Sequence, residues 1–507
     1  MKIQFVFAPT RTQARLGEMS EGRTPPLSLL YLAAYLRKKR DDEIAAPPNA
    51  TGGTPVPLNG SRNDNLEMRV EDGLMLGMEK TLDRVKEFKP DVLAVSFYTP
   101  QAEGAYALIN NIKKVLPETF VAAGGVHATA LPEEVFERSR PDAVVIGEGE
   151  ETFAELIKLL REKRNSAEDL RRIPGVAFCE NGKTEKTLPR PFIQDLDSIP
   201  FPAYDLIDLK DYKGWYLNKG GLEAPLFSAR GCPYCCTFCS NIVWKMGRPS
   251  VRLRSPENIA DEIEWLVKEY GVNEIYDCSD EFNNNIHNAL AICREIRRRN
   301  LKVWWKTSLR ADRLPEELVK EMALAGCWYA LIGVESGNER TLKGINKKID
   351  LSEVENSCRL LKKYGIKVQG LFMLYNVWEK DGRLEYETTA EVKKTLDYAY
   401  RLVKNRLLDY VGWSITVPYP GSKLYGLAAK HNLIQPEYQG KWEDWLKKDS
   451  YVLSLPGVPL SEQVHLKTRG SVLRAKLILR QKEFGFKDIP WLLKKGFKVL
   501  ANEVKRR

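Results

Sequence analysis

The sequence predicts an α/β protein built from two series of alternating strands and helices, with a mostly helical extension at its C-terminal end. Three observations support this fold class. The chain has 507 residues, more than one ordinary domain holds, and 43% of them are hydrophobic. Short apolar runs alternate with amphipathic segments in two separate stretches, which predicts parallel sheets covered by helices. No apolar run reaches the roughly 18 residues that a membrane-spanning helix needs.

Residues 1–164 contain the first series and are expected to fold as a flavodoxin-like or Rossmann-like domain. Five strand–helix units are predicted, and the segment 41–65 between the first two strands, rich in Pro, Gly, Asn and Thr, is expected to be a long loop. The predicted strands are 2–8, 67–71, 91–98, 119–123 and 143–147, and the predicted helices are 26–40, 78–88, 103–116, 132–138 and 151–163.

Residues 165–224 are expected to connect the two series. Two short strand-like runs at 175–179 and 183–187 flank Asn181 and Gly182, a pair that favours a hairpin turn. Four prolines between residues 189 and 202 then predict an extended linker.

Residues 225–434 contain the second series, six strand–helix units that predict a partial TIM-like (βα)6 barrel. In such folds, ligands bind at the carboxyl ends of the strands. The predicted strands are 226–229, 274–279, 303–308, 329–335, 368–374 and 411–417, and the predicted helices are 256–269, 287–299, 316–324, 351–364, 390–404 and 423–431.

Residues 435–507 are basic and aromatic and are expected to form a mostly helical extension. Near its end, apolar residues including Leu493 and Phe497 share one helical face, while lysines such as Lys494 and Lys498 lie around the other. This pattern can suit a helix that rests on an anionic membrane surface, but it is more typical of a terminal helix packed on the barrel with a solvated basic face.

The segment 230–239, with the sequence RGCPYCCTFC, follows the first predicted barrel strand and carries three cysteines in the pattern C-x3-C-x2-C. Closely spaced thiolates of Cys232, Cys236 and Cys239 can hold one iron–sulfur cluster and leave a fourth iron without a protein ligand. A disulfide is a poor alternative, because no secretory signal is visible and the chain's other cysteines are scattered singly. Structural zinc usually needs a fourth ligand, and no second cysteine pair lies near in sequence. Cys235 leaves a second triad open, with Cys232 and Cys239.

The pattern, with the aromatic Phe238 before the last cysteine, resembles the radical S-adenosylmethionine superfamily. The resemblance favours the triad that includes Cys236 and implies a 4Fe-4S cluster whose open iron binds the amino and carboxylate groups of S-adenosylmethionine. It also implies that an electron from the cluster releases a 5′-deoxyadenosyl radical.

Several barrel positions resemble the S-adenosylmethionine site of this superfamily. Glu335 ends the fourth predicted strand and is expected to accept hydrogen bonds from the ligand, or else to cap the next helix. Ser308 and Arg310 end the third strand, and Arg310 is expected to pair with the ligand's carboxylate or to hold Glu335. The family's glycine-rich motif after the second strand is absent, and Asp280 and Glu281 stand there as candidates for binding the methionine amine.

The first domain resembles the cobalamin-binding domain that is fused to some radical S-adenosylmethionine enzymes. Glycines after its fourth strand allow close approach of a ligand, and the following helix start favours a phosphate. The positions expected to line the groove for the nucleotide tail of cobalamin are Ser96, Tyr98, Gly124, Gly125, His127, Thr129 and Glu148.

The loop after the first strand, residues 9–17, lacks the His that ligates cobalt in many cobalamin domains. Cobalt without this lower ligand favours transfer of a methyl group as a radical. His127 is a candidate contact to the tail and not a cobalt ligand, or it is a helix-start His that bonds locally.

The resemblance implies a cobalamin-dependent radical S-adenosylmethionine enzyme that methylates an unactivated carbon of a small-molecule, lipid or tetrapyrrole substrate. The alternatives are an oxidative cyclase with the same cofactors, like the anaerobic cyclase of bacteriochlorophyll synthesis, and a non-catalytic cobalamin or Fe–S sensor. Tyr375, Asn376, Trp378 and Tyr419 are expected to shape an apolar substrate pocket. The expected reductant is a flavodoxin or ferredoxin, the expected location is the cytoplasm, under anaerobic conditions, and no nucleic acid partner is expected. The net charge of +10 is compatible with an anionic ligand or surface.

Overall fold

The structure is a computed structural model that describes residues 1–11, 24–45, 66–212, 218–446 and 450–480. Its contacts divide the chain into two compact units. The first unit contains Met1–Leu226, Asn241–Arg254 and Trp265–Glu274, and the second contains Phe227–Ser240, Ser255–Glu264 and Ile275–Arg507. The two main sheets of the chain are described separately.

The first unit has a flavodoxin-like sheet. Its five parallel strands are β1 (Lys2–Phe7), β2 (Glu67–Asp72), β3 (Val92–Ser96), β4 (Phe120–Gly124) and β5 (Ala143–Val145). They lie in the order β2-β1-β3-β4-β5, the doubly wound order that places a ligand beside the carboxyl ends of β1 and β3, where the winding direction changes. This order confirms the α/β fold class predicted for the first series.

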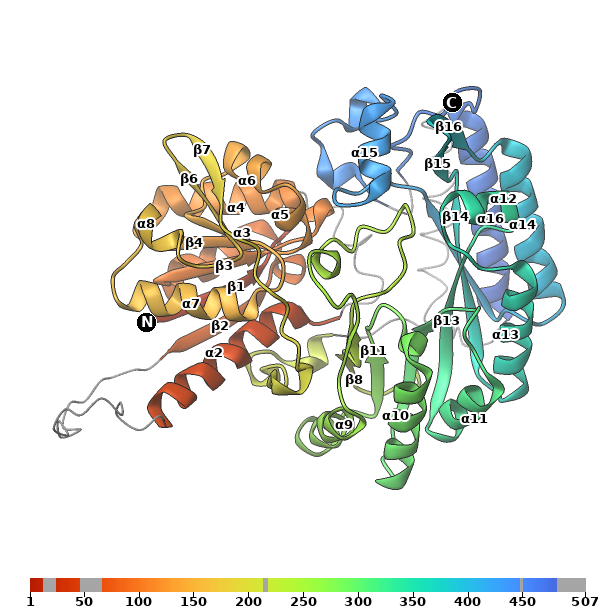
Figure 1. Ribbon diagram of the computed structural model, residues 1–507, viewed down its shortest axis with the longest axis horizontal. Helices are drawn as coiled ribbons and strands as arrows, with labels where there is room; N and C mark the ends of the chain where they lie inside the picture. The colour runs from red at the N-terminus through yellow and green to blue at the C-terminus, as the bar shows by residue number, and fades with distance from the viewer. Residues whose placement is uncertain (12–23, 46–65, 213–217, 447–449, 481–507) are drawn as a thin grey trace. The chain divides into compact units, whose positions relative to one another are not determined.

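Helices cover both faces of this sheet, as Figure 1 shows. Helix α2 packs against α7, and α3 packs against α4. The helices are α2 (Leu27–Ala45), α3 (Gly73–Phe88), α4 (Ala102–Val115), α5 (Val126–Ala130), α6 (Pro132–Arg138), α7 (Glu150–Arg161) and α8 (Ala167–Leu170). Apolar side chains of the central strands, such as Phe5, Val95 and Val121, are almost fully buried between the helix layers.

The hairpin predicted around Asn181 and Gly182 is present and extends the first sheet. Strand β6 (Val176–Glu180) pairs antiparallel with β5, and β7 (Lys183–Lys186) pairs antiparallel with β6. Asn181 and Gly182 have positive φ angles of 50° and 76°, which such a tight turn requires. The predicted connector therefore supplies two further strands of this sheet.

The second sheet has six strands in the order β17-β14-β13-β12-β11-β8, so successive strand–helix units lie side by side as in a partial barrel. Its strands are β8 (Glu223–Leu226), β11 (Glu274–Asp277), β12 (Trp304–Leu309), β13 (Cys327–Glu335), β14 (Lys367–Leu374) and β17 (Tyr410–Ile415). The short strands β9 (Ala229–Arg230) and β10 (Arg252–Leu253) flank the cysteine segment in sequence. The first barrel strand lies three residues earlier than predicted, since it ends at Leu226.

Helices such as α10 (Ile286–Arg298), α11 (Glu316–Leu324), α13 (Leu351–Lys363) and α14 (Thr389–Lys404) lie along the outer side of the second sheet (Figure 1). The other helices of this region are α9 (Pro256–Tyr270), α12 (Glu339–Gly344) and α15 (Lys423–Lys430). Side chains on the inner face of α14, including Val392 and Ala399, are fully buried.

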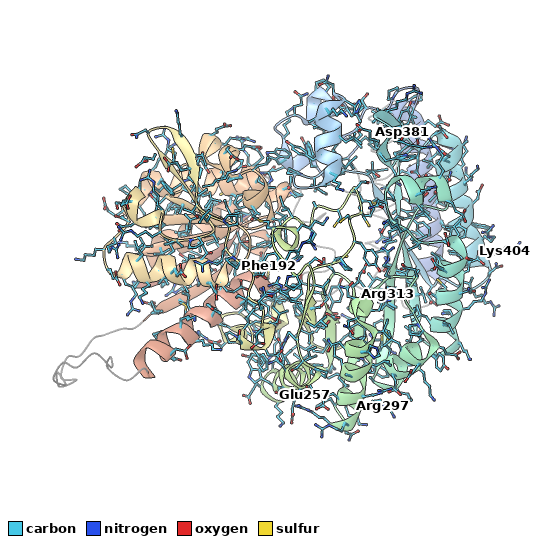
Figure 2. All side chains as sticks on the ribbon, viewed as in Figure 1. Phe192, Glu257, Arg297, Arg313, Asp381 and Lys404 are labelled. Carbon is cyan, nitrogen blue, oxygen red and sulfur yellow. The ribbon has the colours of Figure 1, made fainter. Side chains whose placement is uncertain are left out.

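Two further elements complete the second unit. Strands β15 (Val377–Lys380) and β16 (Arg383–Tyr386) form a hairpin that the sequence analysis did not predict, and Asp381 at its turn is labelled in Figure 2. Helix α16 (Leu460–Arg480) packs against β17 and α14. The amphipathic helix predicted around Leu493 and Phe497 lies outside the described residues. Among the helices that are described, none is both long and apolar enough to cross a membrane.

Candidate functional site

The entry to the cysteine segment is fixed by Asp277, the last residue of β11. Its carboxylate accepts hydrogen bonds from the Ser228 backbone N–H at 3.2 Å, the Ser228 hydroxyl at 2.9 Å and the Thr307 hydroxyl at 3.1 Å. The Ser279 hydroxyl donates to the same carboxylate at 2.6 Å, and it accepts from the backbone N–H groups of Ser228 and Ala229. Because all these groups are buried, each hydrogen bond satisfies a donor that would otherwise be costly to bury.

The cysteine segment itself, residues 231–240, is an irregular loop that the second unit holds at several points. The Asn284 amide donates to the Gly231 carbonyl at 3.1 Å, and Asn284 in turn accepts a bond from Arg313, which is labelled in Figure 2. The Thr237 N–H donates to the Ile345 carbonyl at 3.0 Å, and the Leu424 N–H donates to the Thr237 carbonyl at 2.9 Å. These bonds give a loop without regular structure a defined path.

The three predicted ligand cysteines differ in burial. Cys236 is buried, whereas Cys232 and Cys239 are partly exposed and Cys235 is exposed. Burial, aided by the nearby Glu281 carboxylate, raises the pKa of Cys232 to about 12. Burial also raises the pKa of Cys236. A bound metal offsets such a penalty, because its positive charge deprotonates the thiols that coordinate it.

Two predicted residues near this loop carry opposite charges and find separate partners. Arg310 is 1% exposed, and its guanidinium carbon lies 3.6 Å from the ring centre of Tyr234 in the cysteine loop. Its side chain also donates to the backbone carbonyls of Lys347 and Lys348. Glu335 is held by Lys347, with Oε1 and Nζ 3.0 Å apart. The bond expected between Arg310 and Glu335 is therefore replaced by one from Lys347, a residue that sequence reasoning missed.

Glu281 lies among these charges. Burial raises its pKa to about 7, although Lys347 and Arg310 act to lower it. The negative charge of Asp280, the preceding residue, also raises the pKa of Glu281 and of the Cys232 thiol. Ser308 and Phe238 are partly exposed. The second unit thus gathers the predicted carboxylates, Arg310 and the cysteine loop around one region at the strand ends.

Several buried polar atoms here have no hydrogen-bond partner among the described residues, and Glu281 Oε2 and Arg310 Nη1 are two of them. A buried polar atom without a hydrogen bond is costly. A ligand that carries an ammonium and a carboxylate would satisfy both atoms, because its ammonium can donate to Glu281 and its carboxylate can accept from Arg310. Within the described residues no three His, Cys, Asp or Glu side chains converge on a single metal-ion position. Thiolates that bind different irons of one cluster stand around it rather than on one point, so the donor set fits a cluster with an amino-acid ligand.

The glycine-rich edge of the first sheet, by contrast, presents an aromatic pair. Phe7 ends β1 and Tyr98 follows β3, and their rings pack edge to face with centres 5.6 Å apart. Tyr98 is 53% exposed, and Ser96 and Gly124 are partly exposed. The pair stands at the carboxyl ends of β1 and β3, where this strand order places a ligand.

Gly125 is required by the chain itself. Its φ is 96°, and an added Cβ would stand 2.7 Å from the Phe97 carbonyl oxygen. Only glycine adopts this conformation readily, and only glycine leaves room for the neighbouring backbone. The side of Gly125 on which a Cβ would stand is therefore filled by Phe97 and Ser96, which gives this glycine a packing role.

His127 is fully buried rather than at the surface of a groove. Its Nε2 lies 2.9 Å from the Tyr106 hydroxyl and its Nδ1 lies 3.1 Å from the Thr99 hydroxyl. Burial lowers the pKa of His127 to about 3, which keeps the ring neutral. Thr129 also faces inward and accepts a hydrogen bond from the Gly147 N–H at 3.1 Å. Both side chains hold the first unit together instead of facing a ligand, which is the local-bonding alternative for His127.

Glu148 likewise differs from the expectation that it lines the cobalamin groove. Its two carboxylate oxygens accept bonds of 2.7 and 2.8 Å from the Arg252 guanidinium, in a pair whose side chains are 5% and 2% exposed. Arg252 also donates to the Ile193 carbonyl at 2.8 Å and lies 4.2 Å from the ring centre of Phe192, labelled in Figure 2. The pair therefore ties three segments of the first unit together.

The aromatic residues expected to shape a substrate pocket are mostly internal. Tyr375, Asn376 and Trp378 are 1%, 0% and 2% exposed. Trp378 covers Gly344, and Asn376 donates to the buried Glu387 carboxylate at 3.0 Å. Only Tyr419, of these four described residues, is partly exposed. Burial of the other three corrects the expectation that they line a pocket.

Comparison with protein families matches two parts of the chain. Residues 16–157 match the B12 binding domain, and residues 226–412 match the Radical SAM superfamily. The first match covers most of the flavodoxin-like sheet, and the second begins at the strand that precedes the cysteine loop.

Two relatives of known sequence extend these matches. An uncharacterised methyltransferase of Pyrococcus horikoshii is 32% identical over 436 residues, which are 86% of this chain and 84% of the relative. An anaerobic magnesium-protoporphyrin IX monomethyl ester cyclase of Cereibacter sphaeroides is 32% identical over 352 residues, 68% of this chain but only 54% of the cyclase. The chain therefore spans about half the length of that cyclase.

Among solved structures, the cobalamin-dependent S-adenosylmethionine radical enzyme OxsB with bound aqua-cobalamin has a similar fold. The TM-score is 0.68 at 18% sequence identity, over 94% of this chain and 67% of OxsB. This similarity concerns the fold alone.

Proposed function

Because the chain belongs to the cobalamin-dependent radical S-adenosylmethionine superfamily, we propose that it methylates an unactivated carbon of a small-molecule, lipid or tetrapyrrole substrate. Its cofactors are a 4Fe-4S cluster, S-adenosylmethionine and cobalamin. When bound, these cofactors supply an organic radical that removes a hydrogen atom and a methyl group that takes its place. The protein's own contribution is to bind, orient and shield the reacting groups.

One observation carries the choice of methylation. The relative that matches 84% of its own length is named a methyltransferase, and the match includes both the cobalamin-type sheet and the cysteine loop. The residues of the first unit are consistent with radical methyl transfer. The only His in the sequence of the first unit is His127. Because its ring is buried and hydrogen-bonded to Tyr106 and Thr99, the first unit offers cobalt no free imidazole.

In the second unit we assign Cys232, Cys236 and Cys239 to the cluster. The partnerless oxygen of Glu281 accepts from the methionine amine, and the partnerless nitrogen of Arg310 donates to the methionine carboxylate. Glu335 accepts from the amine or the ribose, while Asp280, Ser308 and Phe238 border the same ligand.

In the first unit we assign cobalamin to the edge near Tyr98, Ser96 and Gly124. The exposed Tyr98 ring provides an apolar face, and the backbone of the glycine turn permits close approach. His127, Thr129 and Glu148 support this edge from within the unit.

Anaerobic reconstitution tests the proposal. The reduced protein is expected to bind cobalamin and to form 5′-deoxyadenosine from S-adenosylmethionine, and Cys236→Ala is expected to lose the second property only. Turnover by a protein that binds no cobalamin would contradict the proposal, and a complete lack of 5′-deoxyadenosine would favour a sensor.

Oxidative cyclisation is the second candidate, favoured by the 32% identity to the magnesium-protoporphyrin cyclase. Both reactions need the same cofactors, so the distinction rests on product mass. Methylation adds one methyl group, whereas cyclisation removes hydrogen atoms. The proposed electron donor for either reaction is a flavodoxin or ferredoxin, and a peripheral membrane contact through the C-terminal segment remains part of the proposal for a lipid substrate.

A further inference from the structure

The loop that follows α12, residues 345–348, contacts three parts of the candidate site in the second unit, and we call it the brace. Its first two residues hold the cysteine loop. The Ile345 carbonyl accepts from the Thr237 N–H at 3.0 Å, and the Asn346 side chain donates to the Cys235 carbonyl at 2.9 Å. These bonds lie on either side of Cys236 in the cysteine loop.

The last two residues of the brace hold the charged residues at the strand ends. The backbone carbonyls of Lys347 and Lys348 both accept hydrogen bonds from Arg310. The Lys347 ammonium donates to Glu335, and the two side chains are only 8% and 11% exposed. One short loop therefore connects the cysteine segment, Arg310 and Glu335.

Charge explains why Lys347 is needed. A carboxylate that is buried without a partner loses its hydration and becomes costly to keep ionised, whereas a paired carboxylate retains its charge. In this pair the lysine engages Oε1 of Glu335. Lys347 thus fixes the direction of the Glu335 side chain.

Gly333, which lies two residues before Glu335 in β13, leaves room for the pair of Lys347 and Glu335. A Cβ added at Gly333 would stand 2.6 Å from Glu335 Oε1 and 2.8 Å from Lys347 Nζ. Because these distances are shorter than atoms tolerate, no side chain at residue 333 is compatible with the pair as it stands. Gly333 therefore makes room for the contact.

The backbone at both ends of the contact is strained. Asn346, Lys348 and Glu335 have positive φ angles of 56°, 53° and 66°, a region that residues other than glycine rarely adopt. Such conformations persist only where the surrounding structure imposes them, and they concentrate at functional sites.

We propose that the brace is the positioning element of the S-adenosylmethionine site, and that Lys347 positions Glu335 for the ligand while Asn346 and Ile345 position the cysteine loop. Lys347 acts through Glu335 and does not touch the ligand. This proposal rests on the proposed function, because it concerns binding of S-adenosylmethionine by this site.

The main experiment compares reconstituted Lys347→Met with wild-type protein. Iron content and binding of S-adenosylmethionine are measured separately, the latter by equilibrium dialysis and by the change that S-adenosylmethionine causes in the electron paramagnetic resonance spectrum of the reduced cluster. We expect iron content to stay near the wild-type value and the affinity for S-adenosylmethionine to fall about tenfold or more. Lys347→Arg, which keeps the charge, is expected to recover most of the affinity.

Matched controls separate this role from a general loss of structure. Lys363→Met removes a lysine from an exposed ion pair with Glu316, and Gly426→Ala adds a methyl group where nothing lies within 4 Å. Both are expected to bind S-adenosylmethionine as the wild type does. Gly333→Ala leaves Lys347 in place but displaces the pair, so it is expected to weaken binding as Lys347→Met does.

The other half of the brace is tested with Asn346→Ala. Loss of its bond to the Cys235 carbonyl is expected to speed removal of iron by a chelator about tenfold, with Lys363→Met as the control.

The outcomes are distinguishable. Binding of S-adenosylmethionine by Lys347→Met within twofold of the wild type would overturn the proposal. If Lys347→Met does not hold a cluster, the binding of S-adenosylmethionine by Gly333→Ala becomes the test. Wild-type affinity in Gly333→Ala would also overturn the proposal. Failure of the wild-type protein itself to bind S-adenosylmethionine would instead refute the proposed function.

Discussion

The cysteine-loop region of the second unit and the glycine-rich edge of the first unit use different chemistry. In the second unit, Arg310, Lys347 and Glu335 bring buried charges to the strand ends beside the partly exposed Glu281, and polar atoms of Arg310 and Glu281 lack hydrogen-bond partners in the described chain. In the first unit, the buried polar residue His127 is satisfied internally, and the aromatic ring of Tyr98 is exposed.

This difference indicates two ways of binding. A small zwitterion is recognised by charges held in fixed positions, because electrostatic interactions strengthen where water is excluded. A large cofactor is accommodated by backbone shape and apolar contact, while the polar side chains beneath keep the edge in place. Substitutions in the second unit should therefore change ligand binding, and substitutions of buried polar residues in the first unit should change stability.

The largest effect is expected for the cysteines. Cys232→Ala, Cys236→Ala and Cys239→Ala should each lose the cluster, because two thiolates do not hold it. Cys235→Ala is the matched control and should retain iron at the wild-type level, since Cys235 is exposed and offers only its backbone carbonyl to Asn346. Iron and sulfide content per chain measures both outcomes. Iron loss in Cys235→Ala with retention in Cys236→Ala would reverse the assignment.

The next effect concerns stability of the first unit. Arg252→Met leaves the Glu148 carboxylate buried without its partner, which should lower the free energy of unfolding by about 3–5 kcal/mol. Arg172→Ala, which removes an exposed pair with Glu168, should cost no more than about 1 kcal/mol. Thermal unfolding of the two variants gives the comparison. Equal unfolding temperatures would show that the Glu148 pair is not structural.

A pH effect is expected from His127. Its pKa in the folded protein is about 3, well below the ordinary value, so the unfolded chain takes up a proton first as the pH falls. Stability should therefore decrease below about pH 6.5, by about 1.4 kcal/mol per pH unit, or about 2 kcal/mol at pH 5.

His127→Gln should lack this component of the pH dependence, whereas His465→Gln, at an exposed position, should keep it. Denaturant unfolding at pH 7 and pH 5 measures the difference. If the free energy of unfolding depends on pH in the same way in the wild type and in His127→Gln, His127 does not lie in the buried network.

The smallest effect is expected for Tyr98→Ala. Loss of an exposed aromatic ring should weaken cobalamin binding about tenfold, or about 1.4 kcal/mol, without lowering the unfolding temperature. Absorbance titration with cobalamin gives the affinity. An unchanged affinity would exclude the Tyr98 edge as the binding surface.

Most strands of the two main sheets could be predicted because they are short apolar runs with clear boundaries, such as β1 and β3. The hairpin at Asn181 and Gly182 followed from its turn residues, and Asp381 with Gly382 carries the same kind of signal for the β15–β16 hairpin, although that hairpin was not predicted. The cysteine spacing and the strand-end positions of Arg310 and Glu335 also indicated which residues gather in the second unit.

The pairings between side chains could not be predicted. Lys347 lies in a loop with no strand-end pattern, and only the fold brings it to Glu335. Arg252 is 104 residues from Glu148 in sequence, so nothing in the local sequence indicates that it takes that carboxylate. His127 follows the glycines as a ligand-binding residue would, yet burial decides its role.

The central claim is most directly tested by anaerobic turnover with methyl-labelled methionine in an extract that supplies S-adenosylmethionine and candidate substrates. The expected result is a product that is heavier by one labelled methyl group, formed with 5′-deoxyadenosine, dependent on added cobalamin and absent with Cys236→Ala. A product that has lost hydrogen atoms and carries no label would contradict methylation.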